Sequence, residues 1–497
     1  MAATFQAPLK NPKRIFIGGE WVAPSSDALI DVIAPATEEL YVQVASAQPA
    51  DVDRAVAAAR DAFDNGPWPR MSHKERAEYM NRLADELTAR AGDIAQIWPN
   101  EMGILHSIAL AGAPNAGAFY RYYAGLADTF PFEEEHKTVS GAKVGLLVRE
   151  PVGVVGAIIP WNGPIMITAF KVAPALIAGC TVVIKGSPEA PGHALLMAEA
   201  AEAAGLPKGV INVLIADREA SEALVRNPGV DKISFTGSSA TGCHIASLLG
   251  ERMARYTLEL GGKSAAIILD DYDIETAANE LAARACDMTG QVCAALTRVV
   301  VPRHRADAVA DAIGEAFSKV VVGDPFDAAT QMGPVATRRQ RDRVQGYIDR
   351  AKADGYRVAA GGGRPAHLNR GFFIEPTVFA GVDNNAVIAQ EEIFGPVLAV
   401  VPAADEADAV RIANDSQFGL NGAVFTNDAD RAYAVARQMR TGTVGHNGHL
   451  VDFTIAFGGF KQSGVGREGG VEGLYPYLET KTILLGGRPS HLPPVAA

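Results

Sequence analysis

The chain has 497 residues, of which 48% are hydrophobic, and this is more than one hydrophobic core usually organises, so two or three globular domains are expected. Its 57 acidic and 45 basic residues give a net charge of −12, which argues against nucleic acid or a membrane surface as the main partner and favours a small-molecule ligand. Four cysteines without a C-x-x-C pair are too few for a disulfide scaffold, so a reducing, cytoplasmic location is expected.

The N-terminal region is predicted to be scaffold. No apolar segment of the secretory type follows Met1, so no signal peptide is expected. Residues 52–63 and 73–91 have helical patterns. The second begins after Ser72, with Glu75 three positions later, which is the pattern of a reciprocal N-terminal cap.

From residue 152 onwards, short β-rich runs alternate with helical patterns. The expected strands are 152–159, 181–185, 210–214 and 233–236, and the expected helices are 165–178, 190–204, 218–226 and 239–250. Such alternation predicts right-handed crossovers and a mostly parallel, twisted sheet with helices on both faces. The uncharged run from Pro151 to Phe170 is long enough for a membrane span, but Pro160 and Asn162 interrupt it. A buried strand followed by a buried helix is therefore predicted.

The second half, from about Gly261, repeats this style. Its strand candidates are 265–269, 298–302, 397–401 and 423–426. The fold class is therefore predicted as α/β, with a second α/β domain.

Two residues could together carry a thioester reaction. Glu259 lies in the motif E-L-G-G-K, and Cys293 ends the motif G-Q-V-C. A thiolate attacks carbonyl carbon well, and a nearby carboxylate can take a proton from the water that later cleaves a thioester. Cys293 is expected near the start of a helical stretch, where the helix dipole would lower the thiol pKa. The remaining cysteines are interpreted as small buried hydrophobes, namely Cys180, Cys243 and Cys286.

The side-chain amide of Asn162 allows two interpretations. Together with the backbone N–H of Cys293, its NH₂ group could hold the oxyanion formed by thiolate attack. Asn is also a favoured N-cap, so it could instead cap the helix that begins near Pro164.

Two loops could contact a nucleotide. Gly237 and Gly242 are spaced G-x-x-x-x-G between a predicted strand and a predicted helix. This segment is either a phosphate-binding site or an ordinary turn. Lys185 ends a strand at the edge of the sheet where ligands of open α/β folds bind, so it either hydrogen-bonds ribose hydroxyls or marks the solvent end of a buried strand.

The ten histidines offer no metal spacing, so no metal site is expected. His446 and His449 lie three positions apart without an accompanying cysteine or carboxylate cluster. A Cys–His hydrolase that uses His446 is a rival hypothesis for Cys293.

In combination these motifs resemble the aldehyde dehydrogenase superfamily over nearly the whole chain, from about residue 15 to residue 482. The motifs that carry the resemblance are P-W-N at 160–162, F-T-G-S at 235–238, L-E-L-G-G-K at 258–263, G-Q-V-C at 290–293, E-E-I-F-G-P at 391–396 and F-G-G-F-K-Q-S-G at 457–464. The resemblance implies oxidation of an aldehyde to a carboxylic acid with NAD(P), in a Rossmann-like cofactor domain, an α/β catalytic domain and a small β oligomerisation arm.

The resemblance also implies roles at the reacting centre. Cys293 is expected to add to the aldehyde, Asn162 to hold the oxyanion, and Glu259 to activate the water that hydrolyses the thioester. Lys171 is similar in position to a residue that helps to organise the site. Glu468 is similar to a second carboxylate in a proton path.

By the same resemblance, Lys185 and Glu392 hold the cofactor riboses. The full set of expected cofactor residues is Ile158, Pro160, Trp161, Lys185, Ser187, Gly237, Ser238, Leu260, Gly261, Glu392 and Phe394. Many NAD-preferring members carry a glutamate three residues after the strand-ending lysine, but here that position is Pro188, and Glu189 follows. NAD is expected, and NADP stays open.

Substrate specificity is expected to come from an apolar tunnel. Its predicted lining consists of Gly163, Met166, Phe170, Leu450, Phe453 and Phe457. Gly163 stands where relatives often carry an aromatic residue, which favours an apolar aldehyde of some bulk.

The predicted domains are a cofactor domain (1–126 and 149–260), a catalytic domain (261–463), and an arm with the C-terminal tail (127–148 and 464–497). The arm resembles the element through which family members pair sheets, and uncovered strand edges favour pairing, so a homodimer or homotetramer is expected. Two other activities stay open, a CoA-acylating relative and a non-catalytic member. Glu259 favours the hydrolytic enzyme over the first.

Overall fold

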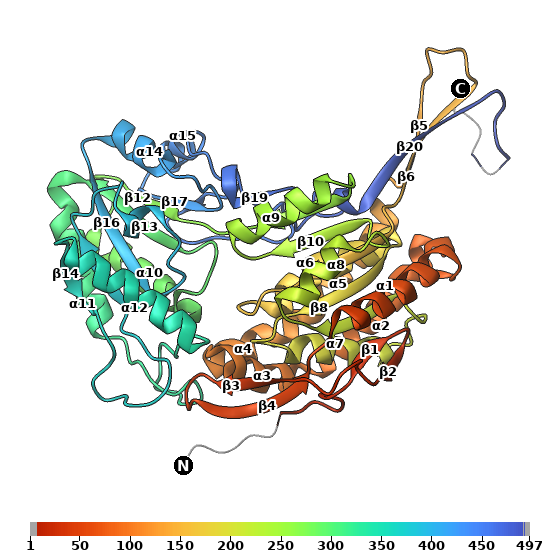
Figure 1. The fold of residues 1–497 in the computed structure, drawn as a ribbon. Coiled ribbons are helices and arrows are strands. Elements are labelled where there is room, and N and C mark those ends of the chain that lie inside the picture. Colours follow the sequence, from red (N-terminus) through yellow and green to blue (C-terminus); the bar gives the residue numbers. More distant parts are fainter. Residues whose placement is uncertain (1–6, 491, 493–497) are drawn as a thin grey trace.

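The computed structural model describes residues 7–490 and 492. The start of the chain, on which the expectation about a signal peptide depends, and the end of the predicted tail lie outside the described residues. Two lobes and a projecting arm make up the molecule (Figure 1).

The first lobe is built on a sheet of eight strands within the described residues, in the order β19-β11-β10-β7-β8-β9-β1-β2. The bounds of these strands are β1 Ile15–Ile17, β2 Glu20–Val22, β7 Val154–Ile158, β8 Thr181–Gly186, β9 Ile211–Ile215, β10 Lys232–Thr236, β11 Arg255–Glu259 and β19 Gly464–Val465. The five strands from β11 to β9 in this order are parallel. Every residue of β7, β8 and β9 is buried, because helices cover both faces of the sheet.

Helices alternate with these strands as the sequence predicts. Their bounds are α1 Pro49–Asp64, α6 Pro164–Ala178, α7 Gly192–Ala203, α8 Arg218–Arg226 and α9 Ser239–Gly250. The uncharged run that could have been a membrane span is β7 followed by α6, which confirms the interpretation as a buried strand and a buried helix. Over the residues that the structure describes, no helix combines the length and apolar character needed to cross a membrane.

A layer of further helices and a hairpin flanks this lobe. The bounds are β3 Leu29–Ala34, β4 Glu39–Ala45, α2 His73–Ala89, α3 Ala91–Met102, α4 His106–Gly112 and α5 Ala118–Thr129. The predicted cap at the start of α2 is confirmed, because the Ser72 hydroxyl accepts from the Glu75 backbone N–H while the Glu75 carboxylate accepts from the Ser72 N–H. Such reciprocal capping satisfies two otherwise unpaired donors.

The second lobe is built on another sheet, which has seven strands within the part of the chain that the structure describes, in the order β14-β15-β16-β13-β12-β17-β18. Its strands are β12 Ser264–Ile268, β13 Leu296–Pro302, β14 Arg357–Ala360, β15 Thr377–Ala380, β16 Val397–Ala403, β17 Gly422–Phe425 and β18 Gly445–His446. Its helices are α10 Ile274–Cys286, α11 Ala306–Ser318, α12 Arg338–Ala353, α13 Val387–Gln390, α14 Glu406–Asn414 and α15 Ala429–Ala436. All four predicted strands of this half are present, so the predicted α/β fold class is confirmed.

Short 3₁₀ helices occur at Trp68–Arg70, Ala113–Gly117, Asp287–Gly290, Arg303–Arg305, Lys461–Ser463 and Tyr475–Tyr477.

The arm is a three-stranded antiparallel sheet that projects away from both lobes (Figure 1). It consists of β5 Glu133–His136, β6 Val144–Pro151 and β20 Leu478–Leu485, with β6 in the middle. The exact domain boundaries stay a prediction. The segment predicted as arm from residue 464 onwards begins with β19, which pairs with β11 in the sheet of the first lobe.

Candidate active site

One cavity of about 530 Å³ is lined by Cys293, Glu259 and Asn162 together. Glu259 is the last residue of β11, Asn162 precedes α6, and Cys293 lies in the turn before β13. The carboxyl ends of parallel strands are where open α/β sheets bind ligands. The fold therefore brings together the three residues that the sequence singles out.

The expectation of a helix start at Cys293 is wrong, and so is the expected direction of its pKa. Cys293 occupies a turn between the 3₁₀ helix at Asp287–Gly290 and β13, so no helix dipole acts on its thiol. Burial raises the pKa of Cys293 to about 12, and the carboxylates of Glu392 and Glu259 add to the shift. The backbone N–H groups of Cys293 and Ala294 act in the opposite direction.

The turn that contains Cys293 is held by close backbone contacts. Gly290 has a φ of +70°, and a Cβ atom there would collide with the backbone of Gly395. A Cβ atom at Gly262 would collide with the carbonyl oxygen of Cys293. Glycine is needed at both positions because a Cβ atom has no space there, and at Gly290 glycine also tolerates the positive φ. Three of the glycine motifs therefore pack against one another around Cys293.

Asn162 is buried beside this turn. Its Nδ2 donates to the backbone carbonyl oxygen of Gln291 at 3.0 Å, and the backbone carbonyl oxygen of Asn162 accepts from the Trp98 indole N–H at 3.2 Å. The N-cap of α6 is Gly163, without a side-chain capping bond, so the interpretation of Asn162 as a helix cap is wrong.

Glu259 is 3% exposed, and neither of its carboxylate oxygens has a hydrogen-bond partner among the described residues. Burial raises the pKa of Glu259 well above its usual value, and the nearby Glu468 adds to this, whereas Lys171 and Arg467 oppose it. A Cβ atom at Gly458, whose φ is +151°, would lie 2.7 Å from Oε1 of Glu259. The carboxylate thus sits in a pocket that glycine keeps open.

A buried ion pair lies next to Glu259. Lys171 Nζ is 2.6 Å from Oε1 of Glu468, and both side chains are almost completely buried. The Ser234 hydroxyl lies 3.3 Å from each of them. Sequence reasoning missed Ser234 and the buried Lys232. The available signal was a polar residue at every second position of β10, whose remaining residues are apolar.

A second cavity, of about 690 Å³, is lined by Lys185, Ser187 and Ile158 of the predicted cofactor residues. Burial lowers the pKa of Lys185 to about 8. Ala240 and Thr241 in the first turn of α9 also line this cavity. A lysine at the end of a parallel strand and the N-terminus of a helix together fit the adenosine half of a dinucleotide.

The other predicted cofactor residues do not line this second cavity. They are Pro160, Trp161, Gly237, Ser238, Leu260, Gly261, Glu392 and Phe394. Glu392 accepts from the Gly262 N–H at 3.2 Å and contacts Gly261, and burial raises its pKa to about 7. The Phe394 ring meets the Trp161 ring edge-on at 5.4 Å. The Glu392 carboxylate acts on the Cys293 thiol, so it lies on the Cys293 side, where a nicotinamide riboside would have to reach.

Most of the residues predicted for the substrate tunnel line the Cys293 cavity. Gly163, Met166, Phe170, Phe453 and Phe457 line the Cys293 cavity. The rings of Phe170 and Phe453 are 4.6 Å apart. Leu450 does not line it, because its side chain turns outward and is 58% exposed; Val451 and His449 line it instead.

The remaining cysteine and histidine predictions have mixed outcomes. Cys180 and Cys286 are buried as expected, but Cys243 is exposed on α9, so the expectation of burial is wrong there. The ring of His446 hydrogen-bonds the Thr426 carbonyl oxygen at 3.0 Å, and His446 does not line the Cys293 cavity. A hydrolase that pairs Cys293 with His446 is therefore disfavoured.

Comparison with known proteins gives the family. The model of the aldehyde dehydrogenase family matches residues 21–483. Geranial dehydrogenase of Castellaniella defragrans is 44% identical over 96% of this chain and 99% of that relative. The 3-succinoylsemialdehyde-pyridine dehydrogenase of a Pseudomonas species is 41% identical over 96% of this chain and 99% of that relative.

Solved structures agree. The Mycobacterium tuberculosis aldehyde dehydrogenase complexed with NAD⁺ superposes with a TM-score of 0.92 at 44% identity, over 95% of this chain and 98% of that one. A cysteine-to-alanine variant of aldehyde dehydrogenase C from Pseudomonas syringae, with NAD⁺ and octanal, gives a TM-score of 0.93 at 39% identity, over 98% and 100% of the two chains. The chain belongs to the aldehyde dehydrogenase family, and it is an oxidoreductase that oxidises aldehydes.

Proposed function

We propose that this enzyme converts an apolar aldehyde to the carboxylic acid with NAD, through a thioester on Cys293 that water hydrolyses. The observation that carries the proposal is the single cavity shared by Cys293, Glu259 and Asn162. The NAD⁺ bound in solved relatives supports the cofactor. A member without catalytic activity would have no use for this constellation.

In the first half of the reaction, the Cys293 sulfur bonds to the aldehyde carbon. With a pKa of about 12 the thiol is protonated at neutral pH, so its proton must pass to water as the carbon–sulfur bond forms. Asn162 Nδ2 and the Cys293 backbone N–H are the donors that would hold the oxygen as it becomes negative. NAD, when bound, supplies the acceptor for the hydride. Loss of the hydride leaves the acyl group as a thioester on Cys293.

In the second half, Glu259 takes a proton from water, and the resulting hydroxide bonds to the thioester carbon. The carbon–sulfur bond then breaks, which releases the carboxylic acid and leaves a Cys293 thiolate that takes up a proton. A raised pKa suits this task because it makes the Glu259 carboxylate a stronger base. The unpaired carboxylate oxygens of Glu259 leave room for the water. The neighbouring charges of Lys171 and Glu468 tune the pKa of Glu259. A CoA-acylating enzyme would not need such a base.

The cofactor would extend from the cavity lined by Lys185 to the cavity lined by Cys293. Lys185 and Glu392 are the residues proposed to hold the riboses, and Ser238 with Gly237 the residues proposed to approach the pyrophosphate. Ser238 caps α9, with its hydroxyl 3.3 Å from the Thr241 N–H. This leaves the other N–H groups of the first turn for phosphate oxygens.

The chemistry of the tunnel supports an apolar substrate. Phenylalanines and Met166 surround the approach to Cys293, and a Cβ atom built at Gly163 would make only an ordinary contact, 3.6 Å from Cδ1 of Ile167. The relative named geranial dehydrogenase and the solved relative complexed with octanal support such a tunnel. For the whole protein, we propose a cytoplasmic homo-oligomer that pairs through the β5–β6–β20 arm, because β20 and β5 each leave one strand edge unpaired within the described residues.

The decisive experiment separates the two half-reactions. Cys293→Ala is expected to abolish NADH formation with any aldehyde. Glu259→Gln is expected to give a burst of about one NADH per active site and then stop at the thioester. Cys243→Ser, which alters an exposed cysteine, is the matched control and should keep wild-type turnover. Wild-type turnover in Cys293→Ala would refute the proposal.

A further inference from the structure

The lysine that ends the motif E-L-G-G-K has no role in the proposed reaction. Lys263 is 2% exposed, and its Nζ has no hydrogen-bond partner among the described residues. It lines a small cavity of about 10 Å³ in the second lobe, between the start of β12, the end of α14 and the turns that precede β17 and follow α15. Such a volume holds one water molecule or one monatomic ion. Because a buried ammonium without a partner is costly, a ligand that compensates it is expected here.

Three other polar side chains that line this cavity also lack partners. The hydroxyl groups of Ser264 and Thr441 and Oδ1 of Asn421 are buried and form no hydrogen bond in the part of the chain that the structure describes. The Asn421 amide is held from its other side, because Nδ2 donates to the backbone carbonyl oxygen of Ala294 at 3.1 Å. Folded proteins leave few buried polar groups unpaired, so four in one small cavity indicate a bound ligand. An ammonium and two hydroxyls are donors, which favours a ligand that accepts hydrogen bonds.

The charge of the cavity favours an anion over a neutral ligand. Among the described residues that line it, three are cationic and none is acidic, the cations being Lys263, Arg298 and Arg440. Arg298 is 1% exposed and donates to backbone carbonyl oxygens and to Oδ1 of Asn384. These neutral acceptors satisfy its hydrogen bonds but do not cancel its charge. A water molecule would leave the excess positive charge in place, whereas an anion would reduce it.

Carboxylates outside the cavity do not remove this excess. Burial and the charge of Arg298 lower the pKa of Lys263 to about 7, while Glu392 and Glu391 act in the opposite direction. The Glu392 carboxylate accepts from the Gly262 backbone N–H, and neither glutamate lines the cavity. An anion in contact with the ammonium would favour its charged form.

We infer that this cavity binds one chloride ion. Lys263 Nζ and the hydroxyl groups of Ser264 and Thr441 are its donors, and Arg440, which is exposed, lies where the ion enters from solvent. A cavity of about 10 Å³ is too small for phosphate or sulfate. The inference is independent of the proposed reaction, because none of these four residues lines the Cys293 cavity.

Thermal unfolding of the whole enzyme measures this binding. Sodium chloride is compared with sodium gluconate at the same ionic strength, since gluconate is too large for the cavity. Chloride is expected to raise the Tm of the wild type by about 2 °C or more, because a ligand of the folded state stabilises it. Lys263→Met is expected to lose this rise. In gluconate it should unfold at no lower temperature than the wild type, because it removes a buried charge that has no partner.

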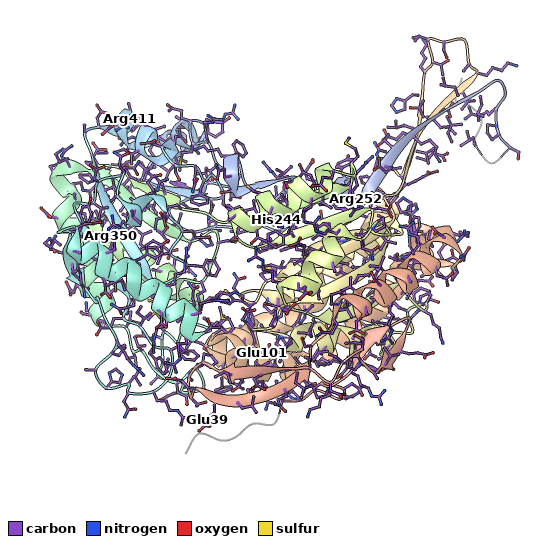
Figure 2. All side chains as sticks on the ribbon, viewed as in Figure 1. Glu39, Glu101, His244, Arg252, Arg350 and Arg411 are labelled. Atoms are coloured by element: carbon purple, nitrogen blue, oxygen red, sulfur yellow. The ribbon has the colours of Figure 1, made fainter. Side chains whose placement is uncertain are left out.

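A second variant and a control complete the experiment. Thr441→Val removes one donor with little change of volume, so it tests the site even if Lys263→Met does not fold. It is expected to raise the chloride concentration of half-maximal effect about tenfold. Arg411 gives the matched control, since it is an exposed cation on α14 that pairs with Asp408 at the surface of the second lobe (Figure 2). Arg411→Met should keep the full chloride effect.

Crystals soaked in sodium bromide locate the ion, because bromide replaces chloride and scatters anomalously. A peak between Lys263, Ser264 and Thr441 is expected in the wild type, and none in Lys263→Met. A wild type with the same Tm in chloride and gluconate would overturn the inference. A full chloride effect in Lys263→Met would also overturn it, because the effect would then come from adventitious ions at the surface.

Discussion

The buried pair next to Glu259 should set the pH at which the thioester is hydrolysed. Glu468 raises the pKa of Glu259 and Lys171 lowers it. Glu468→Gln removes a negative neighbour, and Lys171→Met removes a positive one. The two variants are therefore expected to shift the titration of Glu259 in opposite directions, although they break the same ion pair.

The sign follows from the role proposed for Glu259 as a base, which acts only when ionised. Hydrolysis is lost as the pH falls through the pKa of Glu259. Without Glu468 the ionised form is easier to reach, so the acid limb of the hydrolysis rate moves to lower pH. Without Lys171 it moves to higher pH. A charge within a few ångströms of a carboxyl group typically shifts its pKa by about 1–3 units, so each limb should move by about one pH unit or more.

The same ion pair should also affect the free energy of unfolding. The pair is almost fully buried with 2.6 Å between Nζ and Oε1, and removal of one partner from such a pair costs about 3–5 kcal/mol, because the other charge is left uncompensated. Lys171→Met combined with Glu468→Leu removes both charges and should recover much of this loss. Urea denaturation followed by fluorescence measures the free energy of unfolding.

The assay for the pH effect is stopped-flow NADH absorbance at 340 nm, in which the burst reports acylation and the later linear phase reports hydrolysis. Lys481→Met, which breaks an exposed pair with Glu150, is the control and should leave the profile unchanged. Shifts in the same direction for Glu468→Gln and Lys171→Met would refute the electrostatic reasoning, since a merely loosened site would move both alike.

Two further predictions concern the same cavity. Gly458→Ala places a Cβ atom 2.7 Å from Oε1 of Glu259 at a φ that disfavours alanine, so the linear phase should fall at least about tenfold while the burst remains; an unaltered linear phase would contradict this. In the enzyme without cofactor, alkylation of Cys293 by iodoacetamide, followed by mass spectrometry, should accelerate about tenfold per pH unit between pH 7 and 9, because the pKa of Cys293 is about 12; a plateau below pH 9 would count against it.

The elements that the sequence predicted are those whose pattern is local. Strands β7, β8 and β9 are continuous apolar runs between helical patterns, so composition alone locates them. Strand β11 was missed because Arg255 and Glu259 give it charged ends, and only its last three residues are buried. Its place next to β10 comes from parallel pairing over the whole strand, which no local pattern reports.

The same distinction holds within the site. The motifs located Cys293, Glu259 and Asn162, and the structure places them around one cavity. Leu450 was assigned to the tunnel, but the backbone turns its side chain outward. A one-residue error of this kind is expected in a loop, because no periodicity fixes which side chains face inward.

The ionisation of Cys293 depends on contacts that join distant parts of the chain. A helix start would have lowered its pKa through local N–H groups, and those of Cys293 and Ala294 do act in that direction. Burial together with Glu392 and Glu259 outweighs them. A protonated thiol is a poor target for oxidants, since the thiolate is the reactive form. The two carboxylates proposed for cofactor binding and hydrolysis therefore also protect the proposed nucleophile at rest, and peroxide should oxidise the exposed Cys243 before Cys293.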